Sequence, residues 1–249
     1  MATSTGYYVY GFTDCPEICK NPGPTIGEAG IVQNIPYQGV GILCSPVNGK
    51  KLQPTRKNLM AHQKVLEAWM KEYTVLPVRF GTVSQSKGTL HHGIRTTLPI
   101  LRAKLRQFKG KHELNLKAFW GKEYIYNHIL EKHPGIKSLR EKITKIKGPQ
   151  VHYRSVELGQ EVERALLAYG EKEAQVIIDE ISSATLMLKK SKVFGELMFL
   201  NLSVLVNDQT EHELDQIVNR VAEKRNGKVK FKYNGPSAPA SFVDIHLKF

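Results

Sequence analysis

Short segments in which apolar and polar residues alternate recur along the chain, and this period of two is typical of half-buried β-strands. After the first such segment, residues 16–30 are rich in proline and glycine and show no period, which indicates a loop. The strands fall into an early and a late group. They are predicted at Tyr7–Phe12, as a pair within Ile31–Val47, and at Val75–Val83, Glu113–Ala118, Leu197–Val206, Val229–Tyr233 and Phe242–Phe249.

Apolar residues spaced three and four apart predict amphipathic helices between these strands. Thr55 is placed to start the first helix, because a threonine side chain can accept a hydrogen bond from the free amides of the first turn. Pro99 must kink the second helix or split it. The helices are predicted at Thr55–Tyr73, Leu90–Phe108, Lys122–Lys132, Ile136–Lys145, His152–Lys190 and Glu211–Arg225, with Gly159 and Gly170 as weak points of the long one.

This order of elements predicts an α+β protein with two domains. Residues 1–109 form an N-terminal α/β domain with a small sheet and two helices, and Gly110 marks its end. Residues 110–249 contain a strand, several helices, a strand–helix–strand unit and a last strand, which resembles a ferredoxin-like sandwich carrying a long helical insertion.

The composition is that of a globular protein, and it changes this picture little. Of 249 residues, 41% are hydrophobic and 24% charged. Apolar runs are far shorter than the ~20 residues needed to span a bilayer, and the N-terminus shows no export signal, so we expect a cytoplasmic protein that does not bind membranes. Cys15 and Cys19 form a C-x3-C pair beside the lone Cys44, and without a second ligand pair they predict no metal site.

Charge is distributed unevenly along the chain, whose net charge is +13. Residues 1–110 contain 14 Lys and Arg against 5 Asp and Glu, and the remainder contains 22 against 18. A concentrated positive charge can steer an acidic partner or nucleic acid, whereas a diffuse charge mainly keeps a protein soluble. Both interpretations remain open at this point.

A search for catalytic motifs assigns no reaction. The sequence has no phosphate-binding glycine loop, no G-x-S-x-G elbow and no H-E-x-x-H motif. His91 and His92 are adjacent, so on a helix they cannot readily share a ligand, and a surface pair at a helix start is the preferred interpretation. His62 lies on the apolar stripe of its helix, where a hydrogen-bonded core histidine is expected. We therefore predict a protein without catalytic residues or cofactors.

Several segments, in order, resemble the gas vesicle protein F/L family. The most specific is the run VLPVRFGTV at 75–83, within which we single out Leu76, Pro77, Arg79, Phe80 and Gly81. Arg79 is expected to be either paired on burial or turned outward at the strand end. The opening YYVYGF, the segment GKHELNLKAFW and the ending NGPSAPASFVDI follow the family in order and spacing, although Ser237, Ala238 and Ala240 replace aromatic residues common in the family.

The resemblance implies a minor gas vesicle component or assembly factor and no enzyme. Its partners would be the small hydrophobic shell protein of the vesicle, which it would keep from aggregating during nucleation, and other minor gas vesicle proteins. Its place would be the cytoplasm and the gas vesicle.

Two classes of partner therefore remain from the residues themselves. Arg95, Arg102, Arg106 and Lys109 are seven, four and three residues apart, so an uninterrupted helix would place them in one stripe suited to an acidic region of a protein partner. The alternative is a basic ferredoxin-like nucleic-acid-binding protein, because Phe231 and Tyr233 alternate with Lys228, Lys230 and Lys232. The surroundings of these residues do not match the RNP1 pattern, so nucleic acid is the less favoured partner.

Overall fold

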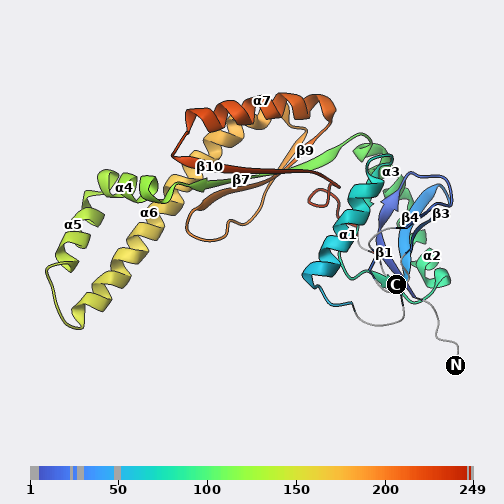
Figure 1. Cartoon of the computed structure of the whole chain (residues 1–249), viewed down its shortest axis with the longest axis horizontal. Helices are drawn as coiled ribbons and strands as arrows, with labels where there is room; N and C mark the ends of the chain where they lie inside the picture. Colours follow the sequence, from blue (N-terminus) through green and yellow to red (C-terminus); the bar gives the residue numbers. More distant parts are fainter. Residues whose placement is uncertain (1–5, 23–24, 27–30, 48–51, 246, 248–249) are drawn as a thin grey trace. The chain divides into compact units, whose positions relative to one another are not determined.

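The structure is a computed structural model that describes residues 6–22, 25–26, 31–47, 52–245 and 247. It contains two antiparallel sheets together with helices, which confirms the α+β class (Figure 1). Two compact units divide the chain, one made of residues 1–113 with 235–249 and the other of residues 114–234. The predicted domains, 1–109 and 110–249, stay a prediction, because compactness alone does not show which segments fold independently.

The sheet of the first unit has the strand order β2-β3-β4-β1-β5, and β6 pairs with β1 as well. β1 runs antiparallel to β4, with a bulge between Val9 and Gly11, and Gln38 and Gly39 connect β3 to β4 with positive φ angles of 48° and 77°. The strands are β1 (Gly6–Thr13), β2 (Lys20–Pro22), β3 (Ile31–Tyr37), β4 (Val40–Val47), β5 (Val75–Pro77) and β6 (Val83–Ser84). β2 lies in the segment predicted to be a loop, since a three-residue strand is too short for a recognisable period.

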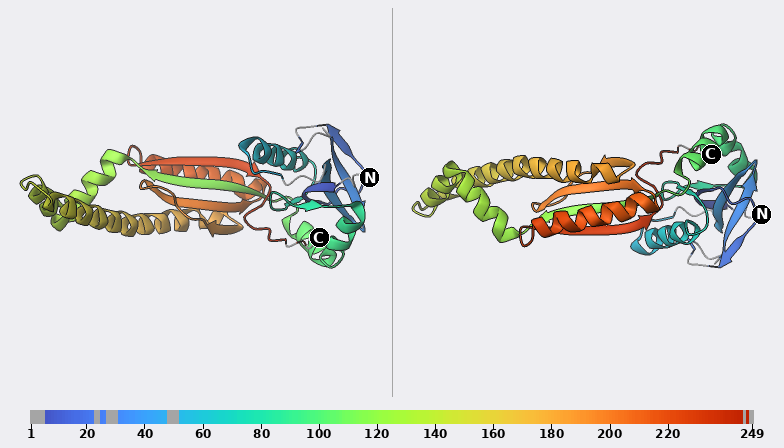
Figure 2. Two further views of the ribbon diagram at one scale, coloured as in Figure 1. Left: turned by 90° about the horizontal axis from the view of Figure 1, so that it is seen from below. Right: turned by 90° about the horizontal axis from the view of Figure 1, so that it is seen from above.

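Three helices cover this sheet, where two were expected. α1 (Arg56–Trp69) begins at Thr55, whose side chain accepts from the amide of Asn58, and packs on the face that carries Tyr8 and Tyr10. α2 (Lys87–Arg95) and α3 (Leu98–Phe108) lie on the opposite side (Figure 2). They are separate helices because Pro99 lacks an amide proton and occupies the first turn of α3, the position in a helix where proline is tolerated.

The second unit contains a four-stranded sheet in the order β10-β7-β9-β8, the arrangement of a ferredoxin-like βαββαβ fold (Figure 1). Between β7 and β8 the chain inserts three helices instead of one. The elements are β7 (His112–Trp120), α4 (Lys122–Lys132), α5 (Pro134–Ile143), α6 (Gln150–Ile181), β8 (Met187–Lys190), β9 (Met198–Val206), α7 (Asp208–Lys224) and β10 (Val229–Ser237).

Two predictions for this part of the chain were wrong. The long helix ends at Ile181, and the residues up to Lys190 form a short 3-10 turn and β8, which completes the sheet. The strand predicted at 242–249 is absent from residues 242–245 and 247, which are turn or irregular, while 246, 248 and 249 lie outside the described residues. In their place Ser241 binds Glu113 through its amide and its hydroxyl, at 2.8 and 2.6 Å.

The core of the second unit explains why only half of α6 is buried. Ala165, Leu166, Ala174, Ile177 and Ile181 pack against the sheet, whereas the part of α6 before residue 165 has no buried residue. Gly170 permits this packing, because a Cβ at that position would lie 3.0 Å from the Cβ of Phe199 on β9. No described helix combines the length and the apolar character needed to cross a lipid bilayer.

Candidate functional site

The run that carries the family resemblance is a strand exit, and its side chains are divided between core and solvent. Leu76 and Pro77 are buried in β5, which ends at Pro77 and does not continue to Val83 as predicted. Gly81 turns the chain with a φ of 89°, which glycine tolerates without strain. The run therefore bends away from the sheet after three residues and returns as β6.

Phe80 from this run closes an aromatic cluster around His62 of α1. The His62 ring stacks on Tyr10 at 5.6 Å and meets Tyr8 and Phe80 edge-on at 5.8 and 6.0 Å between ring centroids. The Tyr8 hydroxyl lies 2.8 Å from His62 Nδ1 and accepts from the amide of Gly81 at 3.4 Å. Burial lowers the pKa of His62 to about 4 and raises that of Tyr8. His62 is thus a neutral, hydrogen-bonded core histidine, as its position on the apolar stripe predicted.

Arg79 points outward, the second of the two arrangements expected for it. Its guanidinium lies 3.7 Å from the Asp244 carboxylate, and the two side chains are 79% and 69% exposed. An ion pair this exposed contributes little to stability, because water and salt screen the attraction. Arg79 is therefore available to a partner, while its neighbours in the run serve the packing of the core.

His91 and His92 do not form a joint site, and they lie in the middle of α2 instead of at its start. The His91 ring stacks on Tyr37 of β3 at 4.2 Å, and burial, assisted by nearby Lys87, lowers its pKa. His92 is exposed on another side of the helix. The pair thus separates into a packing residue and a surface residue, as the angle between adjacent helical positions requires.

The four basic residues predicted to bind a partner are all exposed but lie on two helices. Arg95 ends α2, Arg102 and Arg106 lie one turn apart on α3, and Lys109 follows α3 directly. Arg102 has a structural contact, because its guanidinium donates from Nε and Nη2 to the carbonyl of Gln38 in the β3–β4 turn, the former at 3.1 Å. The single stripe of an uninterrupted helix is therefore wrong, and Arg95, Arg106 and Lys109 are the freer members.

The segment containing these helices has an unusual charge composition. Residues 87–112 include seven Lys and Arg and not one Asp or Glu. Within the described part of the chain, Arg95, Arg106 and Lys109 make no ion pair with a carboxylate. Ile100 of α3 is 53% exposed, so an apolar side chain stands on the helix that carries Arg102 and Arg106. The α2–α3 surface, meaning the exposed side chains of residues 87–109, thus offers positive charge with an apolar contact.

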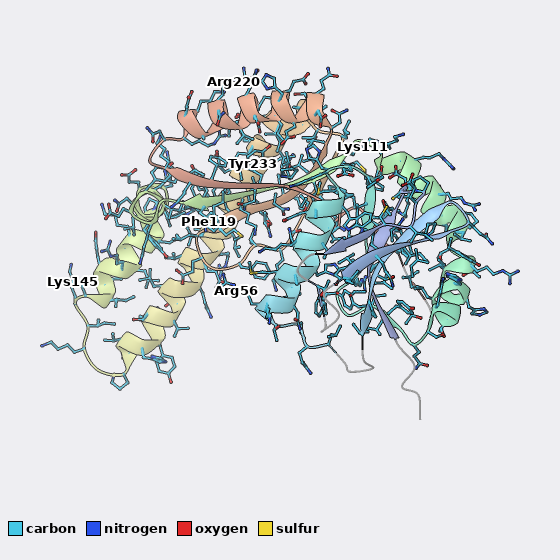
Figure 3. The ribbon with its side chains drawn as sticks, turned by 45° about the vertical axis from the view of Figure 1, so that its right-hand side comes forward. Arg56, Lys111, Phe119, Lys145, Arg220 and Tyr233 are labelled. Atoms are coloured by element: carbon cyan, nitrogen blue, oxygen red, sulfur yellow. The ribbon has the colours of Figure 1, made fainter. Side chains whose placement is uncertain are left out.

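The alternative nucleic-acid interface is not favoured by the structure. Phe231 and Tyr233 of β10 are half-buried against the core of the second unit, so less of their ring surface is left for bases to stack on (Figure 3 labels Tyr233). Lys232 lies over the ring of Phe119 and Lys228 over that of Tyr124, at 5.2 and 5.7 Å to the ring centroids. Two of the three lysines, Lys228 just before β10 and Lys232 within it, thus engage aromatic rings of their own unit.

The similarity to known proteins extends over nearly the whole chain. Residues 6–244 match the family model described as "Gas vesicle synthesis protein GvpL/GvpF". Gas vesicle protein F of Nostoc sp. is 28% identical over 97% of this chain and 99% of its own length, and that of Microcystis aeruginosa is 26% identical with the same coverage. The crystal structure of GvpF from Anabaena sp. superposes with a TM-score of 0.81 at 26% identity, over 98% of this chain and 100% of that one.

Proposed function

Because the chain belongs to the gas vesicle synthesis protein GvpL/GvpF family, we propose that it is an assembly factor or minor component that binds the shell protein of gas vesicles and limits its aggregation. Family membership supports a role in gas vesicle formation. The shell protein as partner is what the family resemblance implies, and the α2–α3 surface is the proposed place of contact. Other minor gas vesicle proteins are further candidates for partners, and the proposed role requires no catalytic residue or cofactor.

The observation that carries this proposal is the α2–α3 surface, which belongs to a segment, residues 87–112, with seven Lys and Arg and no carboxylate. Helices that only need solubility usually mix both signs of charge, since neighbouring like charges repel. A one-sign surface with exposed Ile100 is suited to a partner that combines acidic and apolar regions. Arg95 and Arg106 also lie in the last turns of their helices, where a positive charge stabilises the helix itself by about 0.3–1 kcal/mol.

Association kinetics separate the role of Arg95 and Arg106 in partner binding from their role in stabilising the helix ends. Shell protein purified from gas vesicles is immobilised, and the full chain is passed over it at low and high ionic strength. We expect the variant Arg95→Glu/Arg106→Glu to associate about tenfold more slowly at low salt and to lose most of its salt dependence, because steering acts on the on-rate. The melting temperature reports the helix-terminal role separately.

The matched control is Lys57→Glu/Lys64→Glu, which makes the same change in net charge on exposed positions of α1 in the same unit. This control should associate at nearly the rate of the unmodified chain. Equal slowing of both variants would mean that total charge, and not the α2–α3 surface, governs the encounter. An unchanged on-rate for Arg95→Glu/Arg106→Glu would place the interface elsewhere.

Light scattering tests the second half of the proposal. Shell protein diluted out of denaturant should scatter less when the full chain is present, and the Arg95→Glu/Arg106→Glu variant should protect less well than its control. Scattering that is the same with and without the chain would remove the anti-aggregation role while leaving binding intact.

A further inference from the structure

A groove between α5 and α6 of the second unit is a feature that the proposed function does not use. It encloses about 1090 Å³, which exceeds the roughly 300–1,000 Å³ typical of small-molecule sites. One wall is the end of α4 with α5 and the segment after it, and the other is the first half of α6. The groove exists because the first half of α6 is not covered by the core: none of its residues before 165 is fully buried, although Leu158 and Val162 pack partly against the core, and α5 lies beside this half.

The floor of the groove is apolar. Ile136 and Ala165 are 6% and 8% exposed at its base, and Leu139, Ile146 and Ala168 line it further along. Leu139 and Ile146 are only half-buried and Ala168 is exposed, so a partner that covers them would remove apolar surface from water, which favours binding. The floor therefore provides an apolar contact surface between two parallel rows of polar residues.

Five positive and two negative side chains form the rim. Both carboxylates are already neutralised, since Glu157 pairs with Arg154 at 2.7 Å and Glu161 with Arg164 at 3.0 Å. Lys132, Lys142 and Lys145 remain, all exposed and without an ion pair among the described residues (Figure 3 labels Lys145). The rim thus has an excess of three positive charges along the α5 wall.

From this arrangement we infer that the groove binds an acidic amphipathic helix of a partner protein. The apolar face of such a helix would cover the floor, while its carboxylates would meet Lys132, Lys142 and Lys145 at the rim. Both walls are helices, whose ridges of side chains accept a third helix, and neither has the unpaired strand edge that an extended peptide would need. An apolar floor offers nothing to phosphates, which makes nucleic acid the poorer occupant.

The probe for this inference is a fluorescent helical peptide with leucine at i, i+3, i+4 and i+7 spacing and glutamate on its other face. A scrambled peptide of the same composition has the same charge but no apolar stripe. Anisotropy of the full chain should show binding of the first peptide and at least tenfold weaker binding of the second. Equal affinities would show a diffuse charge effect and overturn the inference, and so would no binding of the amphipathic peptide.

Variants of the rim locate the binding. Lys142→Glu/Lys145→Glu should weaken the peptide at least tenfold, and Lys142→Gln/Lys145→Gln should weaken it less, without placing new carboxylates near Glu157 and Glu161. The matched control is Lys137→Glu/Lys147→Glu, which alters exposed lysines of the same segment that do not line the groove.

The results of these measurements decide where the peptide binds and which kind of ligand the groove accepts. Equal loss in the rim variants and the control would place the peptide outside the groove. Competition by an RNA oligonucleotide or by anionic phosphatidylserine vesicles, if it depends on Lys142 and Lys145 as the peptide does, would assign the groove to phosphate-bearing ligands and refute a helical protein partner. We expect all variants to remain folded, because the exchanged side chains are exposed, and their melting curves check this.

Discussion

His62 belongs to a residue type that often acts in catalysis, but here its side chain serves the packing of the core. Its ring is enclosed by Tyr8, Tyr10 and Phe80, and its Nδ1 is bonded to a hydroxyl whose own pKa is raised. Protonating the ring here would be unfavourable, because the resulting imidazolium would lack both its hydration and a neighbouring anion. The same contacts that hold the family-specific run against α1 therefore make the first unit sensitive to acid.

The direction of this sensitivity follows from the two pKa values of His62. In the unfolded chain it takes up a proton near pH 6.5, and in the folded chain only near pH 4. Between these values the unfolded state binds more protons, so stability falls as the pH decreases, by up to about 1.4 kcal/mol per pH unit. Urea unfolding at several pH values should show this slope, and His62→Leu or His62→Gln should reduce it. A slope unchanged in both variants would mean that another group titrates.

At the scale of elements, Gly159 and Gly170 occupy the same helix in opposite surroundings. Nothing lies within 4 Å of a Cβ built at Gly159, whereas one at Gly170 meets the Cβ of Phe199 at 3.0 Å. Phe199 in turn stacks on Trp120 at 4.1 Å, so it cannot give way easily. Only one of the two glycines is required by the packing of α6 on the sheet.

This contrast predicts opposite effects of the same substitution. Gly159→Ala should raise the free energy of unfolding by about 0.5–1 kcal/mol, because alanine loses less backbone freedom in a helix. Gly170→Ala gains the same helix propensity but must displace Phe199, so it should lower the free energy of unfolding. Urea unfolding of both variants under the same conditions gives the comparison. Stabilisation by both would show that β9 can move away from α6 at little cost.

Elements with a clear period were predictable from the sequence, and those set by tertiary contacts were not. β7 and α7 follow their alternation or helical spacing closely, because each has one buried face, and β9 was recognisable from its apolar run although it is buried along most of its length. β8 spans four residues with no buried position, and its sequence gives no sign that the preceding helix has ended. Only its pairing with β9 identifies it as a strand. The alternating end of the chain at 242–245 is not a strand, because an alternating pattern does not provide a neighbouring strand to pair with.

The candidate surfaces likewise include features that the sequence predicts and features that depend on tertiary contacts. The exposure of Arg95, Arg106 and Lys109 follows from an amphipathic pattern, so the sequence could predict it. The bond from Arg102 to the carbonyl of Gln38 joins residues that are 64 positions apart, and no local pattern indicates it. The groove of α5 and α6 depends on how two helices approach each other, which periodicity alone does not specify.

At the scale of the whole molecule, the α2–α3 surface and the α5–α6 groove belong to different compact units. Perturbations at separate sites that share no contacts usually add. We therefore expect the acidic amphipathic peptide to leave binding of the shell protein unchanged, and Arg95→Glu/Arg106→Glu to leave binding of the peptide unchanged. The chain carrying both the α2–α3 and the Lys142→Glu/Lys145→Glu substitutions should show the two losses independently.

Titration of the shell protein in the presence and absence of saturating peptide measures this independence, because a coupling between sites must appear equally in both binding constants. Independent constants would mean that one chain can hold a shell subunit and a second partner together. That arrangement raises the local concentration of one partner near the other without direct contact between them. If the peptide displaced the shell protein, the two would share one site, and the groove would have to be included in the shell interface.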